Sequence, residues 1–142
     1  MIQLQTTHID AIKQQAESEY PFECCGLLIG IVSSDNRKSV HHILPISNAR
    51  DTENKHNRFL ITPQDLLKGE LFARKHTMDI LGFYHSHPDH PAVPSPYDLD
   101  HAWPVYSYII VAVEKSIAQE ITSWTLEHDR SKFNTETIEK GE

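Results

Sequence analysis

Polar and apolar positions in the first twenty residues follow a helical period. Ile9, Ile12 and Ala16 recur at the spacing of one helix face, while lysine, glutamine and glutamate occupy the other face. The stretch THID, residues 7–10, has the form of a capping box, and Pro21 cannot continue a helix. The pattern predicts an amphipathic helix that begins at this box and ends near Tyr20.

Two more stretches carry a helix N-cap followed by proline. TPQD, residues 62–65, supplies an N-cap, a proline at the first helical position and an acid in the first turn. We expect a helix from there to about His76, with Leu67 and Leu71 facing inward. SPYD, residues 95–98, repeats the signature and predicts a short third helix with Ser95 as its N-cap.

Short apolar runs bounded by turn residues predict the strands. They cover residues 25–32, 39–46, 58–61, 78–87, 106–113 and 118–126. The turn residues SSDNRK and EKS predict hairpins between the first two and between the last two of these strands. In the strand over 78–87, alternate side chains share a face, so His85 and His87 should project the same way from its end.

About six strands and three helices favour an α/β or α+β fold around one mixed sheet. The length of 142 residues is that of one ordinary domain, so we expect residues 1–142 to form a single domain. The tail from Asp129 is polar and is expected to fray, although Phe133 and Ile138 are apolar enough to dock.

The charge of the chain argues against nucleic acid as a partner. The net charge is −7, and lysine and arginine form no cluster that could neutralise phosphates. No apolar run approaches the roughly 20 residues of a membrane span, and the N-terminus lacks the pattern of a secretory signal. We therefore expect no membrane partner and a cytoplasmic location, while the oligomeric state stays open.

The two cysteines, Cys24 and Cys25, are adjacent and lack the second CxxC pair of a structural zinc site. Neighbouring residues cannot staple distant parts of a fold with a disulfide. We interpret both as small buried residues beside the strand over 25–32, and a thiol chemistry is the alternative.

Residues 82–100, GFYHSHPDHPAVPSPYDLD, hold three histidines, four prolines and three aspartates, too little apolar surface to fill a core. Two imidazoles at His85 and His87, joined by Asp98 after a proline-rich loop, suit a tetrahedral zinc ion with its fourth position open, as in hydrolytic zinc enzymes. Exposed histidine pairs are common, so the pair alone is weak evidence. His90 and His101, the other histidines nearby, are interpreted as loop residues without a role in the site.

A zinc hydrolase also needs a base that takes a proton from water and delivers it to the leaving amine. Glu23, in the stretch YPFECCGLLIG just before a buried strand, is the candidate. From the residues alone such a glutamate is more often a solvated turn residue, and Ser95 is explained as a helix cap.

These stretches together resemble the JAMM, or MPN-plus, metalloprotease family. That pattern has an upstream glutamate, then His-Ser-His-Pro, a serine separated from the second histidine by seven residues, and an aspartate after two more residues. The chain matches it without a gap at Glu23, His85, His87, Ser95 and Asp98. The similarity extends more loosely from about residue 20 to 113. It implies a single curved mixed sheet flanked by helices, with an MPN/JAB-like, cytidine-deaminase-like fold.

The resemblance also implies a role for each motif residue. His85, His87 and Asp98 are expected to hold one zinc ion per chain, Glu23 to act as general base and acid, and Ser95 to hydrogen-bond the oxyanion. Ser86, between the two histidines, should point the other way and be structural.

The family implies a substrate class as well, because its members include deubiquitinating isopeptidases and smaller prokaryotic proteins that process sulfur carriers ending in Gly-Gly. The length of this chain favours the small type. We expect a peptidase or isopeptidase that cleaves after the Gly-Gly of a ubiquitin-like sulfur-carrier protein resembling ThiS or MoaD.

Two alternatives remain open. Some proteins of the wider family are binding scaffolds without metal, although the intact motif argues against this here. Two histidines and one carboxylate also describe the facial triad of a non-haem iron oxygenase. The metal bound by the purified protein separates the three hypotheses.

Overall fold

The computed structural model of the chain describes residues 1–47 and 61–141. Within these residues the helices are α1 (Thr6–Glu19), α2 (Pro63–Lys75) and α3 (Pro96–His101). The strands are β1 (Ile2–Gln5), β2 (Cys25–Val32), β3 (Lys38–Ile46), β4 (Asp79–Pro88), β5 (Ser107–Glu114), β6 (Ile117–Leu126), β7 (Phe133–Glu136) and β8 (Ile138–Gly141).

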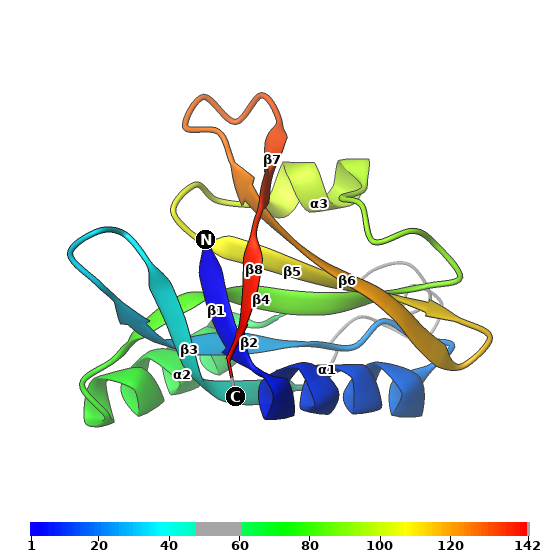
Figure 1. Cartoon of the computed structure of the whole chain (residues 1–142), viewed down its shortest axis with the longest axis horizontal. Coiled ribbons are helices and arrows are strands. Elements are labelled where there is room, and N and C mark those ends of the chain that lie inside the picture. The colour runs from blue at the N-terminus through cyan, green and yellow to red at the C-terminus, as the bar shows by residue number, and fades with distance from the viewer. Residues whose placement is uncertain (48–60, 142) are drawn as a thin grey trace.

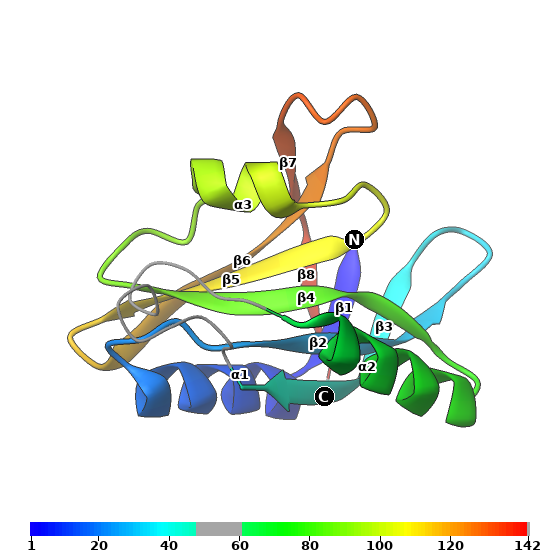
Figure 2. The ribbon, with the colours of Figure 1, turned by 180° about the vertical axis from the view of Figure 1, so that it is seen from behind.

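The eight strands form one mixed sheet in the order β7-β6-β5-β4-β2-β3-β1-β8. β4 runs parallel to β5, and β1 runs parallel to both β3 and β8, while the other neighbours are antiparallel. The strands turn steadily across the sheet, which is therefore curved (Figures 1 and 2). The predicted α/β fold around one curved mixed sheet is confirmed, as are the two hairpins β2-β3 and β5-β6.

Helices cover both faces of the sheet. Ile9, Ile12 and Ala16 of α1 pack into one core with Leu28 and other strand residues. Leu27, next to Leu28 on β2, points to the other face. A Cβ at Gly69 of α2 would lie 2.2 Å from the Leu27 side chain, so α2 packs closely on that other face.

The inward face of α2 differs from the sequence prediction. Leu67 and Leu71 are 56% and 54% exposed, whereas Gly69 and Ala73 are buried. Small residues face the sheet because they allow the helix axis to approach Leu27 closely. The expectation that Leu67 and Leu71 face inward is wrong.

The first helix begins earlier than predicted. Its N-cap is Gln5, whose backbone N–H donates to Nδ1 of His8 at 3.4 Å, and not Thr7. The start is displaced because residues 2–5 form β1, a strand that the sequence pattern did not predict. The chain leaves the sheet at Gln5 and enters the helix at once.

The C-terminal segment belongs to the sheet instead of fraying. β7 pairs with β6 at one edge, β8 pairs with β1 at the other, and the Ile2 N–H donates to the Thr137 carbonyl oxygen between them at 3.0 Å. Phe133 and Ile138 both pack against buried clusters, so they dock as the sequence suggested. One continuous segment thus joins the two sheet edges, as the upright C-terminal strand in Figure 1 shows.

Most of the strand predicted over 58–61 lies outside the described residues. In residues 1–47 and 61–141, no helix has both the length and the apolar character needed to cross a bilayer.

Candidate metal centre

The end of β4 and the first turn of α3 bring His85, His87 and Asp98 together. One ligand atom from each side chain lies within 4.8 Å of the others. The two imidazole Nε2 atoms are 3.1 Å apart, and each is 3.1–3.2 Å from a carboxylate oxygen of Asp98. Both histidines are buried. The three predicted ligands therefore converge on one point.

The local structure explains this convergence. His85 and His87 alternate on β4, so both rings project from the same face of the strand. Asp98 is held by a reciprocal cap, because its Oδ2 accepts the Ser95 N–H at 2.8 Å and its own N–H donates to the Ser95 Oγ at 3.1 Å. The capping signature in the sequence thus fixes the position of the third candidate ligand.

The contacts of His87 show that the cluster suits a cation. Its Nδ1 lies 2.8 Å from the carbonyl oxygen of Pro91, which can only accept, so Nδ1 carries the proton and the neutral ring has its lone pair on Nε2. That lone pair faces the Asp98 carboxylate. Ligand atoms roughly 2.0 Å from a tetrahedral zinc ion are roughly 3.3 Å apart, close to the distances here.

Ionisation favours the forms that bind metal. Complete burial lowers the pKa of His85, so its ring favours the neutral state. Although burial opposes it, the neighbouring His85 and His87 hold the pKa of Asp98 well below its usual range. A neutral imidazole and an ionised carboxylate are common donors to a divalent metal.

Glu23 lies two residues before β2, next to the segment that pairs with the end of β4. Cys25 is in register with His85, and the Ser86 N–H donates to the Cys24 carbonyl oxygen at 3.2 Å, so the chain runs beside β4 as far as Cys24, the neighbour of Glu23. Glu23 is 4% exposed. Burial, and then the charge on Asp98, raise the pKa of Glu23 to about 9.

Ser86 and the cysteines support the backbone at this point. Ser86 is fully buried, and its Oγ accepts the Cys24 N–H at 2.8 Å, which agrees with its predicted structural role. Both cysteines are buried and not joined by a disulfide. Burial raises the pKa of Cys24 to about 12 and that of Cys25 further, so neither is a reactive thiolate near neutral pH.

Two features around the candidate metal site were not predicted from the sequence. The carbonyl oxygen of Pro91 orients the His87 ring, and no side-chain pattern could reveal a backbone contact. His101, interpreted from sequence as having no role in the site, stacks on Tyr97 with ring centroids 4.0 Å apart and lines a small cavity beside His85 and Asp98. His90 is exposed.

An apolar groove of about 620 Å³ continues from this cavity. Tyr97, His101 and Tyr108 line both, so the groove adjoins the cavity that His85 and Asp98 line. Phe83 and Trp103 supply further aromatic surface, and Trp103 is 64% exposed. A concave apolar surface next to a metal site can hold an extended ligand.

Comparison with known protein sequences gives one family. The family described as prokaryotic homologs of the JAB domain matches residues 5–127. A probable TtuB-protein conjugate cleaving protease of Thermus thermophilus is 33% identical over 97 residues, 68% of this chain and 60% of that protein. A desampylase of Haloferax volcanii is 30% identical over 99 residues, 69% of this chain and 68% of the relative. The chain thus matches about two thirds of the length of these relatives or less.

Solved structures have the same fold. A protein of Desulfitobacterium hafniense is 29% identical with a TM-score of 0.86, and the match covers 100% of this chain and 94% of that one. A JAB1/MPN domain protein of Archaeoglobus fulgidus is 19% identical with a TM-score of 0.56, and the match covers 99% and 95% of the two chains. The second likeness concerns the fold alone.

Proposed function

The chain belongs to the family of prokaryotic homologs of the JAB domain, and from this and the geometry of the site we propose that it is a zinc-dependent metallopeptidase or isopeptidase. The convergence of His85, His87 and Asp98 beside a buried Glu23 is the observation that carries the proposal.

His85, His87 and Asp98 are the zinc ligands in this proposal. Their donor atoms, spacing and ionisation suit one zinc ion with a coordination position left for water or substrate. When bound, zinc supplies a Lewis acid that polarises the scissile carbonyl and lowers the pKa of a water molecule to about 7.

Glu23 moves the proton. Its carboxylate takes a proton from the attacking water and then delivers it to the nitrogen of the leaving amine, so the peptide or isopeptide bond breaks with the net uptake of one water. The buried position of Glu23 near Asp98 supports this role, because it places the carboxyl group beside the candidate ligands. The Glu23 carboxyl group gives up this proton to the amine nitrogen as the C–N bond breaks.

Ser95 stabilises the developing negative charge on the carbonyl oxygen. Its Oγ already accepts the Asp98 N–H, which fixes the hydroxyl next to a metal ligand while its hydrogen can be donated elsewhere. A fixed hydroxyl donor of this kind can lower the barrier by roughly 3 kcal/mol. Ser95 then serves both as a helix cap and as the oxyanion donor.

The substrate is a ubiquitin-like sulfur-carrier protein, cleaved after its C-terminal Gly-Gly. The name of the Thermus relative, a conjugate cleaving protease, supports this class. The apolar groove that adjoins the cavity beside His85 and Asp98 offers room for an extended chain end. Glycine at the cleavage site lets that chain pass close to the histidines and to Glu23 without side-chain clashes.

Cleavage of defined substrates tests the proposal. Zinc-loaded protein is incubated with ThiS-like and MoaD-like carriers that carry a short peptide after Gly-Gly, or that are joined through Gly-Gly to a lysine side chain. Mass spectrometry should find the carrier ending in Gly-Gly. Substrates with Ala-Ala in place of Gly-Gly, and the His87→Ala variant, are the controls. If none of the substrates were cleaved, the proposed activity would be refuted.

Metal analysis of the protein purified without added metal separates the remaining hypotheses. Zinc at about one equivalent per chain supports the hydrolase. Iron together with oxygen consumption would support an oxygenase, and absence of metal would support a binding scaffold.

A further inference from the structure

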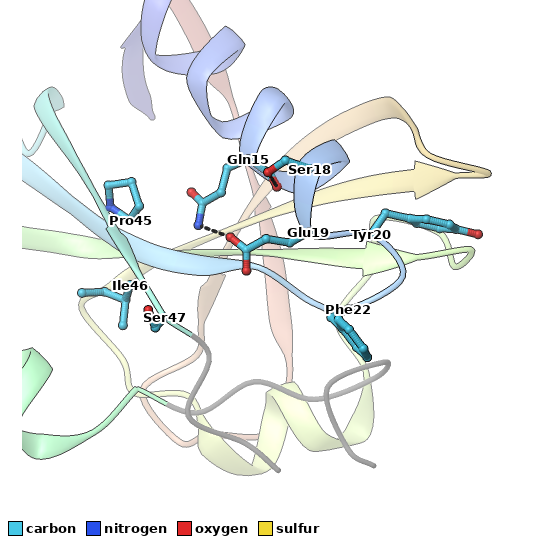
Figure 3. A pocket seen from close by; sticks show the side chains of 8 residues that line it. All are labelled: Gln15, Ser18, Glu19, Tyr20, Phe22, Pro45, Ile46 and Ser47. Atoms are coloured by element: carbon cyan, nitrogen blue, oxygen red, sulfur yellow. Dashed lines mark hydrogen bonds between the residues drawn. The ribbon is translucent and has the colours of Figure 1, made fainter. Parts of the chain in front are cut away.

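A side-chain bond joins the loop that carries Glu23 to the turn that follows His87. The Tyr20 hydroxyl donates to Asp89 Oδ2 at 2.6 Å. Tyr20 is the C-cap of α1, three residues before Glu23, and Asp89 follows the HSHP segment directly. Figure 3 shows Tyr20 at the end of α1, pointing away from the pocket residues Gln15 and Glu19.

In sequence, Glu23 lies between two hydrogen-bonded connections to β4, the strand of His85 and His87, and to the residue that follows it. On its C-terminal side, the Cys24 N–H donates to Ser86 Oγ, and the Ser86 N–H donates to the Cys24 carbonyl oxygen. On its N-terminal side, the connection is the bond from Tyr20 to Asp89. Both connections end within two residues of a histidine ligand, so they fix Glu23 relative to that ligand pair.

Asp89 is itself anchored from the opposite side. Its N–H donates to the Val113 carbonyl oxygen at 2.5 Å, and its Oδ1 accepts the Lys115 N–H at 3.0 Å. Asp89 also has a positive φ of 57°, a conformation that aspartate tolerates better than most residues. Asp89 therefore connects the β5-β6 turn to the loop of Glu23 through its two carboxylate oxygens.

We propose that Tyr20 and Asp89 are positioning residues that hold Glu23 at the distance from the metal centre that proton transfer requires. The inference rests on the proposed function of Glu23. It assigns no direct role in the reaction to either side chain.

A purely structural role explains this bond less well. Tyr20 and Asp89 meet at the surface, where a hydrogen bond adds little to global stability. α1 is already held by its apolar face, which packs in the main core. Loss of the bond should therefore loosen the loop of residues 20–23 while the fold and the ligand cluster persist.

Substitutions at both ends of the bond test the inference. Tyr20→Phe removes the hydroxyl and keeps the ring, and Asp89→Ala removes both acceptors. Asp89→Asn keeps an acceptor for Lys115 and gains an amide donor for the Tyr20 oxygen, so it should restore much of the bond. Glu17→Gln is the matched control, because Glu17 makes another exposed bond from α1, to the Ala118 N–H at 2.8 Å.

We expect kcat for the Gly-Gly fusion substrate to fall about tenfold in Tyr20→Phe and Asp89→Ala, with KM and zinc content within about twofold of wild type. Asp89→Asn should lie between them and wild type, and Glu17→Gln should match wild type. Amide hydrogen exchange at Phe22 and Cys24 should speed up in the first two variants, while exchange in β5 stays unchanged.

The outcomes distinguish the inference from the proposed function. If Tyr20→Phe and Asp89→Ala kept wild-type kcat, the positioning role would be overturned, whatever the exchange at Phe22 and Cys24. A loss of zinc, or faster exchange across β5, would show a structural role and would also overturn it. If Glu23→Gln kept full activity, the proposed function of Glu23 would fail first, and the inference with it.

Discussion

Among the acidic residues of the candidate site, Glu23 is the one whose ionisation the fold of the metal-free protein disfavours. Its pKa of about 9 arises from burial and from the charge on Asp98. His85 and Asp98 shift in the directions that leave lone pairs available to a metal. The proposed roles of metal ligand and proton carrier thus fall on residues with different surroundings, and substitution can test the two roles independently.

Glu23→Gln should abolish cleavage while the protein keeps its zinc. Glutamine has nearly the same size but cannot carry the proton, and residue 23 is outside the ligand cluster. His87→Ala should lose both cleavage activity and zinc, because it removes one of the three proposed protein ligands. Turnover is measured on the Gly-Gly fusion substrate, and zinc by elemental analysis of the same samples. Unchanged turnover in Glu23→Gln would contradict the proton-transfer role.

Burial of Glu23 also predicts a pH-dependent stability of the metal-free protein. The folded pKa of about 9 exceeds the ordinary value of 4.5, so the folded state retains the proton over that interval. The contribution of Glu23 to the free energy of unfolding is fully present below pH 4.5 and is lost as the pH rises through 9. Over this interval the free energy of unfolding falls by up to about 1.4 kcal/mol per pH unit.

The free energy of unfolding should therefore fall in metal-free wild type relative to Glu23→Gln as the pH rises from 5 to 8.5. Urea denaturation with a chelator present, at three pH values, measures this difference. Comparing the two proteins at each pH largely cancels the titration that they share at His85 and Asp98. A difference that stayed constant with pH would show that Glu23 is not held in its protonated form.

At the scale of elements, the sequence predicted the site better than the faces of the helices. The spacing of His85 and His87 on a strand and the SPYD cap are local patterns, so the three candidate ligands could be named before any fold was known. In α2, Leu67 and Leu71 recur four residues apart, but so do Gly69 and Ala73. Because leucine is larger and more apolar, the sequence pattern predicted that Leu67 and Leu71 face the sheet. Gly69 and Ala73 face it instead, because small residues let α2 approach Leu27 closely.

Gly82 lies at the start of the parallel pairing of β4 with β5, and close approach matters there too. A Cβ on residue 82 would lie 1.9 Å from the backbone oxygen of its partner Ser107. Backbone cannot move aside as a side chain can. Gly82→Ala should therefore lower the free energy of unfolding by about 3 kcal/mol.

Leu71→Ala is the control for this substitution, since Leu71 is more than half exposed and should change stability by no more than about 0.5 kcal/mol. Urea denaturation compares both with wild type. If Gly82→Ala were as stable as Leu71→Ala, the tight approach of β4 to β5 would be refuted.

At the scale of the whole molecule, the sheet depends on pairings between distant parts of the sequence. Ile2 pairs with Ile138, and the polar strand β7 pairs with β6. Such partners leave little trace in a hydrophobic pattern, which explains why β1, β7 and β8 were not predicted. The position of Glu23 depends similarly on the β2-β4 register, so the sequence could assign it only through the family resemblance.

Removal of the residues after Asp129 should expose the edges of β6 and β1, which now pair with β7 and β8. β7 and β8 cover β6 and β1, and Phe133 and Ile138 leave with them. Unpaired strand edges recruit other chains, so we expect the truncated protein to melt at a lower temperature and to self-associate. Light scattering after size exclusion measures the association over a range of protein concentrations.

Glu136→Gln in the full-length chain is the control. The Glu136 side chain on β7 accepts a hydrogen bond from the Ser123 hydroxyl at 2.8 Å. The substitution perturbs this side chain and leaves both strand pairings in place. This variant should keep the association state of wild type. The truncation removes Phe133 from the small cavity beside His85 and Asp98 but none of the three candidate ligands, so truncated protein that stays folded should still bind zinc. Equal melting temperatures for truncated and full-length protein would mean that the two edges are stable without the segment that joins them.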